Sequence, residues 1–502
     1  MAAAPTQRDA AGAGLVLRSA PGRIALAATV GASSMASLDA TVVNVALPHI
    51  GDDLHAGVSA LQWVLTGYLL ALASLILLGG ALGDRLGRRR VFLAGTAWFA
   101  LASLLCGLAP TVGVLVAARV LQGAGGALMT PGSLAILQAS FRESDRAAAV
   151  GAWSGLGGVA GAVGPLVGGL LVDGPGWRWA FLVNLPVAAA VVVCARRAVP
   201  ESRDPHAARG LDGRGAALAV AGLAGATWSL NEAARRGWGD TLVLAAGAVA
   251  GLAVFAFVRH VRRTPDPLVP PALFRNPVFT VVNLGTVFLY AAIGLAFFLV
   301  SYQLQVAAGW SALGAGLALL PATVVMLALS ARSGRLAQRI GPRLQLTAGP
   351  VLAGAGLLLL ARTGRHPTWA ADVLPGALLF GFGLVTFVAP LTATVMAAAD
   401  ADHVSVASGV NNAVARAAGL AGIAVVPVVS GLTTATGAAE VTHAFRVALV
   451  IAAVTATIAG PLMAVGLSAG VRGRRSARRL HCAVDGPPLQ PDPARCPLTA
   501  AR

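Results

Sequence analysis

The segment Leu38–Pro48, which reads LDATVVNVALP, decides the fold. It continues an apolar run that begins near Ile24, and it places the carboxylate of Asp39 about midway along an expected membrane-spanning helix. A charged carboxylate at that depth costs roughly 2.5–3.5 kcal/mol on insertion scales. Every other acidic residue falls in a loop, in a tail or within about one turn of an expected helix end. This exception favours a role for Asp39 in handling protons or cations.

The composition is typical of a polytopic helical membrane protein. Of the 502 residues, 57% are hydrophobic and only 11% are charged, whereas a soluble domain carries about 25% charged residues. Apolar runs of about 20 residues alternate with short loops that carry arginine. The alternating polarity of a membrane β-barrel is not seen in the sequence. The expected fold class is therefore an all-α polytopic membrane protein.

The apolar runs predict fourteen membrane spans. We place them near residues 24–46, 59–82, 91–109, 112–137, 146–171, 180–195, 214–231, 241–259, 278–306, 312–331, 344–361, 372–397, 404–432 and 444–468. The seventh and eighth spans form a pair added between two better-defined halves. The chain then divides into a cytoplasmic tail, a six-helix bundle, two linker helices with their loops, a second six-helix bundle and a disordered basic tail, at 1–22, 23–198, 199–275, 276–469 and 470–502.

The distribution of charge gives the expected orientation. The formal net charge is +17, from 37 basic and 20 acidic residues, and we find no lysine. The arginines gather in alternate loops, which follows the positive-inside rule rather than the pattern of a nucleic-acid surface. The exceptions are Arg235, Arg236, Arg362 and Arg365. We expect a multi-pass protein of the cell membrane with both termini in the cytoplasm.

One loop motif occurs twice. Residues 80–89 read GALGDRLGRR after the second span, and residues 334–343 read GRLAQRIGPR after the tenth. Two halves that carry one loop motif predict a duplicated transporter fold, with the substrate site between the halves near the bilayer midplane. Gln338 replaces the acidic residue in the second copy.

Further motifs point to a known family. Residues 115–127 read LVAARVLQGAGGA, residues 161–169 read GAVGPLVGG, and residues 177–186 read WRWAFLVNLP. Together with the loop at 80–89, the first two resemble the signature motifs of the major facilitator superfamily. The segments 38–48 and 177–186 are similar to marks of its fourteen-span drug:proton antiporter subfamily. The resemblance implies a two-bundle fold with two extra central helices.

Asp39 and Arg119 are the candidate proton-coupling residues. Burial disfavours the charged form of a carboxylate, so Asp39 could load and release a proton near neutral pH. Arg119 lies inside the fourth span and cannot shed its charge, so it needs a polar cavity or a partner. The alternatives are that Asp39 only hydrogen-bonds a neighbouring helix and that Arg119 belongs to a fixed structural ion pair.

The fifth span is rich in glycine and contains one proline. Glycines four residues apart permit close approach of another helix, and a proline adds a kink. Packing alone is one explanation of this pattern. The family resemblance implies an antiporter hinge or seal, formed by Gly161, Gly164, Pro165, Gly168 and Gly169.

The first copy of the loop motif is a candidate conformational latch. Gly83 and Gly87 permit a tight turn, and Arg85 and Arg88 fit a cytoplasmic loop. Topology alone does not explain Asp84, which can pair with arginine or cap a helix. The resemblance implies that this loop stabilises one state of an alternating-access cycle.

Several polar residues inside spans are possible cavity residues. Those of the first half are Asn44, Gln62 and Gln122, and those of the second half are Asn411, Asn412 and Arg416. The last three fall roughly on one helix face. They could line the cavity or seal the two halves against each other.

We therefore expect a secondary transporter that exports hydrophobic drugs or antibiotic-like molecules in exchange for protons. A proton-coupled symporter or facilitator of the same fold is the main alternative, and a non-transporting receptor is another. Without lysine there is no nucleotide-binding loop of the Walker type. We expect no enzyme activity, cofactor, metal or nucleic-acid partner, and a monomer in contact with lipid, substrate and protons. One acid against two arginines does not favour a purely cation-specific cavity, and the substrate charge stays open.

Overall fold

The computed structural model describes residues 14–203, 212–265, 267, 269–399 and 404–471. Apart from an isolated bridge between Leu15 and Phe141, these described residues form no β-structure. The helices of the first half are α1 (Ala20–Asp53), α2 (Val58–Leu86), α3 (Arg88–Gly107), α4 (Val112–Ser140), α5 (Glu143–Asp173), α6 (Trp179–Leu182) and α7 (Asn184–Ala198). The middle of the chain forms α8 (Gly213–Arg236) and α9 (Thr241–Val261).

The second half repeats the pattern of long helices with short breaks. It contains η2 (Pro271–Arg275), α10 (Pro277–Tyr302), η3 (Gln303–Ala307), α11 (Ala312–Ala318), α12 (Leu320–Ile340), α13 (Arg343–Leu360), η4 (Trp369–Val373), α14 (Leu374–Ala397), α15 (Val404–Val429) and α16 (Ala438–Val471). The all-α prediction is confirmed. The predicted terminal tails lie largely outside the described residues, which begin at residue 14 and end at residue 471.

Each of the fourteen predicted spans falls on a helix, but not every helix meets the same test for spanning a membrane. In the described part of the chain, 12 helices are long and apolar enough to cross a bilayer. The other two predicted spans fall on α5, whose qualifying apolar portion is Val163–Asp173, and on α8. The count of fourteen therefore stays a prediction.

Local sequence signals explain where several helices begin. The side chains of Ser19 and Thr111 accept hydrogen bonds from backbone N–H groups of the first turns of α1 and α4. Asp240 caps α9 in the same way. Such caps stabilise a helix by about 1 kcal/mol because they satisfy otherwise unpaired donors.

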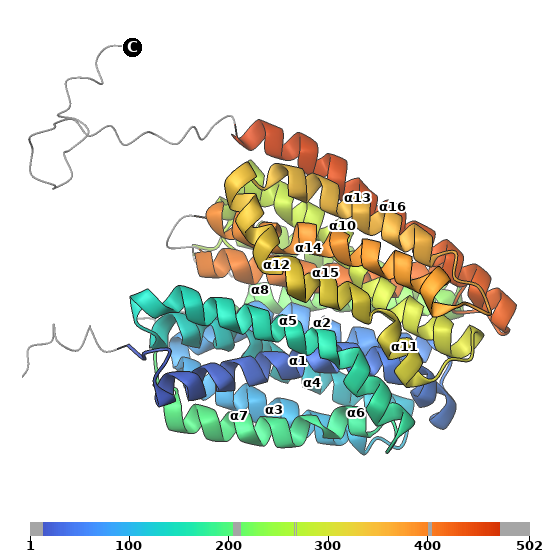
Figure 1. The fold of residues 1–502 in the computed structure, drawn as a ribbon, viewed down its shortest axis with the longest axis horizontal. Coiled ribbons are helices and arrows are strands. Elements are labelled where there is room, and N and C mark those ends of the chain that lie inside the picture. Colours follow the sequence, from blue (N-terminus) through green and yellow to red (C-terminus); the bar gives the residue numbers. More distant parts are fainter. Residues whose placement is uncertain (1–13, 204–211, 266, 268, 400–403, 472–502) are drawn as a thin grey trace, which may run out of the picture.

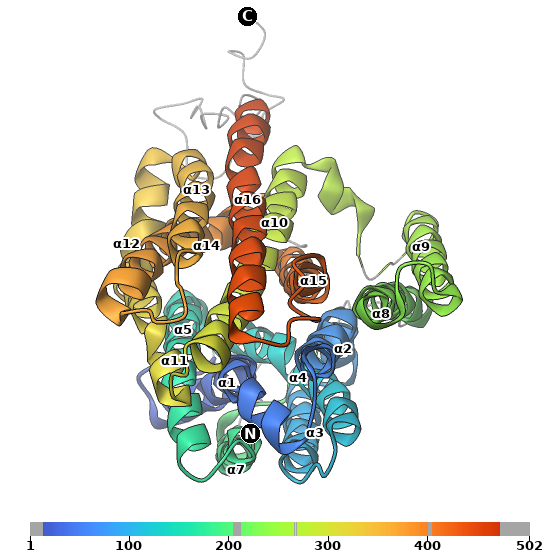
Figure 2. The same cartoon turned by 90° about the vertical axis from the view of Figure 1, so that its right-hand side faces the viewer.

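The long helices form two bundles that lie side by side. Figure 1 shows α1–α7 in one layer and α10 and α12–α16 in the other, while the short α11 reaches toward α5. The pair α8 and α9 lies at one side of this arrangement. α8 packs against α2 and α15, one helix from each bundle, and α9 packs on the outside of α8 (Figure 2).

Polar contacts join the bundles at one end of the molecule. The Asp173 carboxylate accepts hydrogen bonds from the backbone N–H groups of Ala312 (3.1 Å) and Leu313 (2.8 Å), at the start of α11. Nearby, the Gln305 amide donates to the backbone carbonyl of Val45 at 3.1 Å. These contacts lie at the end of the molecule opposite the first turn of α1 and the last turn of α16 (Figure 1). The two bundles are thus closed together at this end.

Candidate functional site

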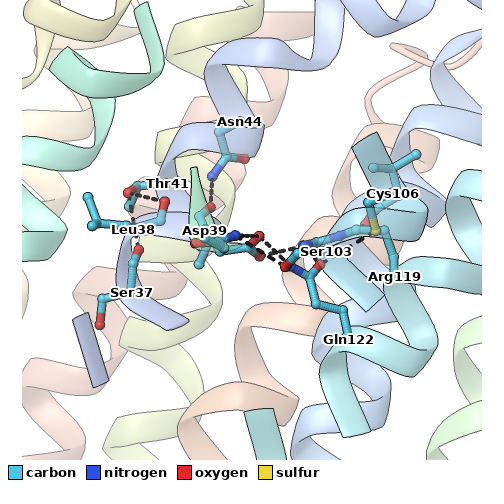
Figure 3. Close-up of polar contacts among 12 residues, drawn as sticks. Ser37, Leu38, Asp39, Thr41, Asn44, Ser103, Cys106, Arg119 and Gln122 are labelled. Carbon is cyan, nitrogen blue, oxygen red and sulfur yellow. Dashed lines mark hydrogen bonds and ion pairs between the residues drawn. The ribbon is translucent and has the colours of Figure 1, made fainter. Parts of the chain in front are cut away.

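Asp39 and Arg119 form an ion pair in the middle of the first bundle. Asp39 lies near the centre of α1 and is 1% exposed, and Arg119 of α4 is fully buried. The guanidinium Nη1 of Arg119 donates to Oδ2 of Asp39 (Figure 3). The charge of each group is therefore balanced by the other in a region that excludes water. Sequence reasoning singled out both residues, and the structure brings them into contact.

Three further polar side chains complete the surroundings of the Asp39 carboxylate. Gln122, one turn after Arg119, donates to Oδ1 of Asp39 at 2.8 Å and to the Ser103 hydroxyl at 2.7 Å. Asn184 at the start of α7 donates to the same Oδ1 at 3.4 Å. Three helices, α1, α4 and α7, thus meet at one carboxylate, and α3 joins the network through Ser103. Uptake of a proton by Asp39 adds an O–H donor among three groups that already donate to this carboxylate, so the network must then rearrange.

Arg119 keeps other contacts that do not depend on Asp39. Its Nε donates to the backbone carbonyl of Val64 at 3.0 Å, and its Nη1 donates to the Gln122 side-chain oxygen at 2.5 Å. The guanidinium lies over the ring of Tyr68, 4.3 Å from the centroid, and 5.7 Å from the ring of Phe181. An arginine stacked on an aromatic ring gains about 2 kcal/mol or more when desolvated. These contacts can hold the guanidinium in place when Asp39 is neutral.

The predicted hinge helix α5 lies between the first bundle and α11. A Cβ added to Gly168 would lie 3.0 Å from the Cα of Val42 in α1, and one added to Gly169 would lie 2.4 Å from the Cα of Leu313. The carbonyl oxygen of Pro165 would lie 2.2 Å from a Cβ added to Gly316 in α11.

Gly164 faces α1 in the same way, with Thr41 as its neighbour, and Gly161 lies one turn earlier in α5. One face of α5 thus contacts α1 close to Asp39, and another contacts the second half. At Gly168 and Gly169 only glycine permits these close approaches, because a Cβ there would meet backbone atoms, whereas a Cβ on Gly164 would meet the Thr41 side chain.

The predicted latch residues form contacts within the first half. Asp84 pairs with Arg88 one turn later, with 2.8 Å between Oδ1 and Nε. Gly87 adopts a φ of 118°, and a Cβ there would lie 2.7 Å from the carboxylate of Glu201. Gly83 is buried near Arg88, and Arg85 is exposed.

The same carboxylate of Glu201 holds the start of α3. It accepts a hydrogen bond from the backbone N–H of Arg89 at 3.1 Å, and its Oε2 lies 3.9 Å and 3.7 Å from the Nε atoms of Arg89 and Arg90. Sequence reasoning missed Glu201, because an acidic residue in a loop carries no signal of its partner. In this state the loop is fixed to the chain segment that follows α7.

The possible cavity residues of the first half make three different kinds of contact. Gln122 belongs to the Asp39 network, as described above. Gln62 of α2 donates to the backbone carbonyl of Ile423 in α15 at 2.8 Å, so it joins the two halves. The Asn44 amide donates to the carbonyl of Ala40 one turn earlier at 2.7 Å.

The other cavity candidates lie on α15. The Asn411 amide donates to the side chains of Asn283 and Thr286 in α10, at 3.1 Å and 3.0 Å. Asn412 and Arg416 are both partly exposed. Asn411 therefore acts within the second half, while Arg416 lies near the middle of a membrane-spanning helix.

Comparison with known proteins identifies the class. The family model described as the Major Facilitator Superfamily matches residues 29–423. This range covers most of the chain, so the chain belongs to the major facilitator superfamily, whose members are transporters rather than enzymes. The resemblance to this superfamily that the sequence motifs indicated is confirmed.

Relatives of similar length support this assignment. The tetracenomycin C resistance and export protein of Streptomyces glaucescens is 37% identical over 418 residues, which are 82% of this chain and 76% of that protein. The puromycin resistance protein of Streptomyces alboniger is 36% identical over 454 residues, 89% of this chain and 88% of that protein.

Solved structures agree in fold. A POT-family peptide transporter superposes with a TM-score of 0.66 over 93% of this chain and 99% of its own, at 14% identity. A bacterial homologue of the lysosomal transporter Spinster, solved in an inward-facing and unoccupied conformation, gives a TM-score of 0.64 over 91% and 99%, at 17% identity. At these identities the likeness shows the fold alone.

Proposed function

We propose that this protein exports hydrophobic, antibiotic-like small molecules in exchange for protons, with Asp39 as the proton carrier. The observation that carries the proposal is the fully buried pair of Asp39 and Arg119 at mid-depth in the bundle. An intramembrane ionisable residue of this kind marks a proton or ion pathway by default. The names of the relatives, which are resistance and export proteins, support drug efflux as the direction of transport.

The network suggests how a proton changes the protein. Protonation of Asp39 removes the charge that balances Arg119, and an uncompensated buried charge costs about 3–5 kcal/mol. The contacts of Arg119 with Val64 and Tyr68 persist, so the guanidinium stays while α1 is freed from α4. Since α1 packs against the glycine face of α5, movement of α1 reaches the contact between the two halves.

The membrane supplies the energy for this exchange. A membrane potential contributes roughly 2.3 kcal/mol per charge per 100 mV, and the pH gradient adds to it. We infer that both termini face the cytoplasm, since the arginine-bearing loops gather on that side. The contacts of Asp173 and Gln305 then close the outer end of the molecule, which corresponds to an inward-facing state. We also infer a monomer, because one chain supplies the whole Asp39 network.

A liposome assay tests the proposal. Purified protein is reconstituted into liposomes that enclose a pH-sensitive dye, and tetracenomycin C is added as the probe under an imposed pH gradient. We expect tetracenomycin C to drive protons across the membrane through the wild type and not through Asp39→Asn at matched insertion. Glu143→Gln is the matched control, since it removes an exposed carboxylate from the first turn of α5.

The other outcomes assign different functions. Movement of tetracenomycin C without protons in both proteins would make the chain a facilitator. Equal proton movement in wild type and Asp39→Asn would leave the exchange standing and reduce Asp39 to a structural residue. Protons and tetracenomycin C moving in the same direction would indicate a symporter.

A further inference from the structure

Arg416 is a membrane-embedded cation that the Asp39 network does not use. It lies 12 residues from the start of α15 and 13 from its end, at mid-depth of a helix that crosses the bilayer. In the described part of the chain, no acidic side chain forms an ion pair with it. Arginine cannot be deprotonated in a protein, so this charge persists at every stage of transport.

The contacts of α15 show which way Arg416 faces. Gly409 lies beside Leu77 of α2, since a Cβ on Gly409 would be 3.2 Å from a methyl carbon of that leucine. Seven residues after Arg416, Ile423 accepts the hydrogen bond from Gln62 of α2. Residues seven apart lie on nearly the same helix face. Arg416, midway between Gly409 and Ile423, therefore faces α2 across the boundary between the two halves.

The same register identifies what lies opposite Arg416. The midpoint between Gln62 and Leu77 on α2 falls between Leu69 and Leu70, within one turn of Tyr68, and the charge of Arg416 acts electrostatically on the side chain of Tyr68. Tyr68 in turn stacks on Arg119 at 4.3 Å. Its hydroxyl is buried and has no hydrogen-bond partner among the described residues.

The charges around this boundary do not cancel. Asp39 balances Arg119, and Glu232 of α8, the helix that covers this boundary, pairs with Arg236 at 3.0 Å. Arg416 is left over, so these groups sum to one positive charge with Asp39 ionised. A cation held at mid-depth beside an unpaired hydroxyl donor is a site for a group that accepts hydrogen bonds and carries negative charge.

We propose that Arg416 binds the anionic group of the exported compound, so that the transported class is hydrophobic molecules with a carboxylate, a sulfonate or an ionised phenol. This inference rests on the proposed export function and names its substrate class. Tyr68 donates a hydrogen bond to the same anionic group. Protonation of Asp39 makes the boundary more positive, so it does not expel a bound anion by repulsion. The exchange of proton for anion is instead coupled through conformation, because the two ions stabilise different conformations of the protein.

The proposal has an energetic consequence that separates it from cation export. Exchange of one proton for one monoanion moves two charges across the membrane in each cycle, whereas exchange of one proton for one monovalent cation moves none. Anion export is therefore driven directly by the membrane potential, even without a pH gradient.

Two xanthene dyes that differ in charge provide the test. Anionic carboxyfluorescein and cationic rhodamine 123 are compared in proteoliposomes at matched insertion of wild type, Arg416→Gln, Arg416→Lys and the control Arg262→Gln, which removes an exposed arginine. We expect Arg416→Gln to lower carboxyfluorescein export roughly tenfold or more, because a hydrogen bond to a charged group is lost. Arg416→Lys should retain most of the export, and Arg262→Gln should match the wild type.

A second measurement needs no variant. A potassium gradient with valinomycin imposes a potential on wild-type proteoliposomes at equal pH on both sides. Acceleration of carboxyfluorescein export by a potential that is negative on the cytoplasmic side supports the proposal. It is overturned if carboxyfluorescein is not exported, if its export ignores the potential, or if Arg416→Gln exports it like the wild type. Rhodamine 123 exchanged for protons, without carboxyfluorescein export, would overturn this inference and leave the proposed function intact.

Discussion

The carboxylate of Asp39 and the guanidinium of Arg119 neutralise each other away from water, so removal of either one should cost stability. We expect Asp39→Asn and Arg119→Gln each to destabilise the protein by about 3–5 kcal/mol, because each leaves one buried charge uncompensated. The double variant should recover much of this loss and stay inactive in exchange. Thermal unfolding in detergent, compared across the four proteins, measures the coupling. Additive losses in the double variant would show that the pair contributes no mutual stabilisation.

Gln122 should stabilise the buried ion pair. In Gln122→Leu the Asp39 carboxylate loses its hydrogen-bond donor at 2.8 Å. Because a lost hydrogen bond to a charged group is worth about 1.5–3 kcal/mol, the free energy of unfolding should fall by about that amount. Thermal unfolding in detergent measures the loss.

Ser103→Ala is the matched control for that experiment. Ser103 contacts Gln122 and Asn184 but no oxygen of Asp39, so its loss should lower the free energy of unfolding less. Equal stability of Gln122→Leu and the wild type would show that Gln122 does not support the ion pair.

At the residue scale, the sequence predicted the charged members of the site and missed part of their polar surroundings. A buried charge in an apolar run is expensive, so Asp39 and Arg119 stand out without a structure. Ser103 and Asn184 do not, because a serine or an asparagine in a helix often satisfies itself on the backbone of the preceding turn. That Asp39 contacts Arg119 also needed the structure, since 80 residues separate them.

Among the elements, α5 connects the proton site to the second half through its glycines. Gly169→Ala should separate α5 from α11, because the new Cβ would lie 2.4 Å from the Cα of Leu313. The state seen here should therefore become less populated. Distances between spin labels on the last turn of α5 and on α11 measure the change.

Gly151→Ala is the control, because it adds the same methyl group to the same helix with no atom within 4 Å. That substitution should favour the helix by about 1 kcal/mol and leave the label distances unchanged. Identical distances in Gly169→Ala and the wild type would show that the contact between α5 and α11 does not determine how often this end is closed.

The positions of the helices along the chain were the feature of the structure that the sequence predicted best. Apolar runs of about 20 residues determine where helices fall, and every predicted span lies on one. The breaks were not predicted. The sixth span is interrupted between Leu182 and Asn184, and the tenth at Leu319, where Pro321 lies in the first turn of α12. Such breaks do not change hydropathy, so a window of 20 residues passes over them.

At the scale of the whole molecule, the contact of Asp173 with the start of α11 should stabilise the state in which this end is closed. Asp173→Ala removes both hydrogen bonds to the start of α11, at a cost of about 0.5–2 kcal/mol, as for other helix caps. The closed end should open more often, and a cysteine introduced at the buried Ala312 should react faster with a membrane-impermeant maleimide. Asp240→Ala also removes a helix cap but lies on α9, so the reaction rate should stay at the wild-type value.

The arrangement of the halves could be predicted only in outline. The repeated loop motif predicts two related halves, but it does not say which state they adopt. That state depends on contacts such as Gln62 with Ile423 and Gln305 with Val45, which join residues far apart in the chain. Each is a backbone carbonyl accepting from a side chain, and no sequence pattern encodes such a partner.

Because Asp39 is buried, the rate at which its carboxyl group takes up a proton reports how often the protein opens. With 1% of the residue exposed, a proton from bulk water reaches it only after the helices around it part. In a rapid pH jump, the observed rate of protonation should therefore be independent of buffer concentration. It should instead equal the frequency with which the protein opens, which makes an otherwise silent conformational step measurable without any label.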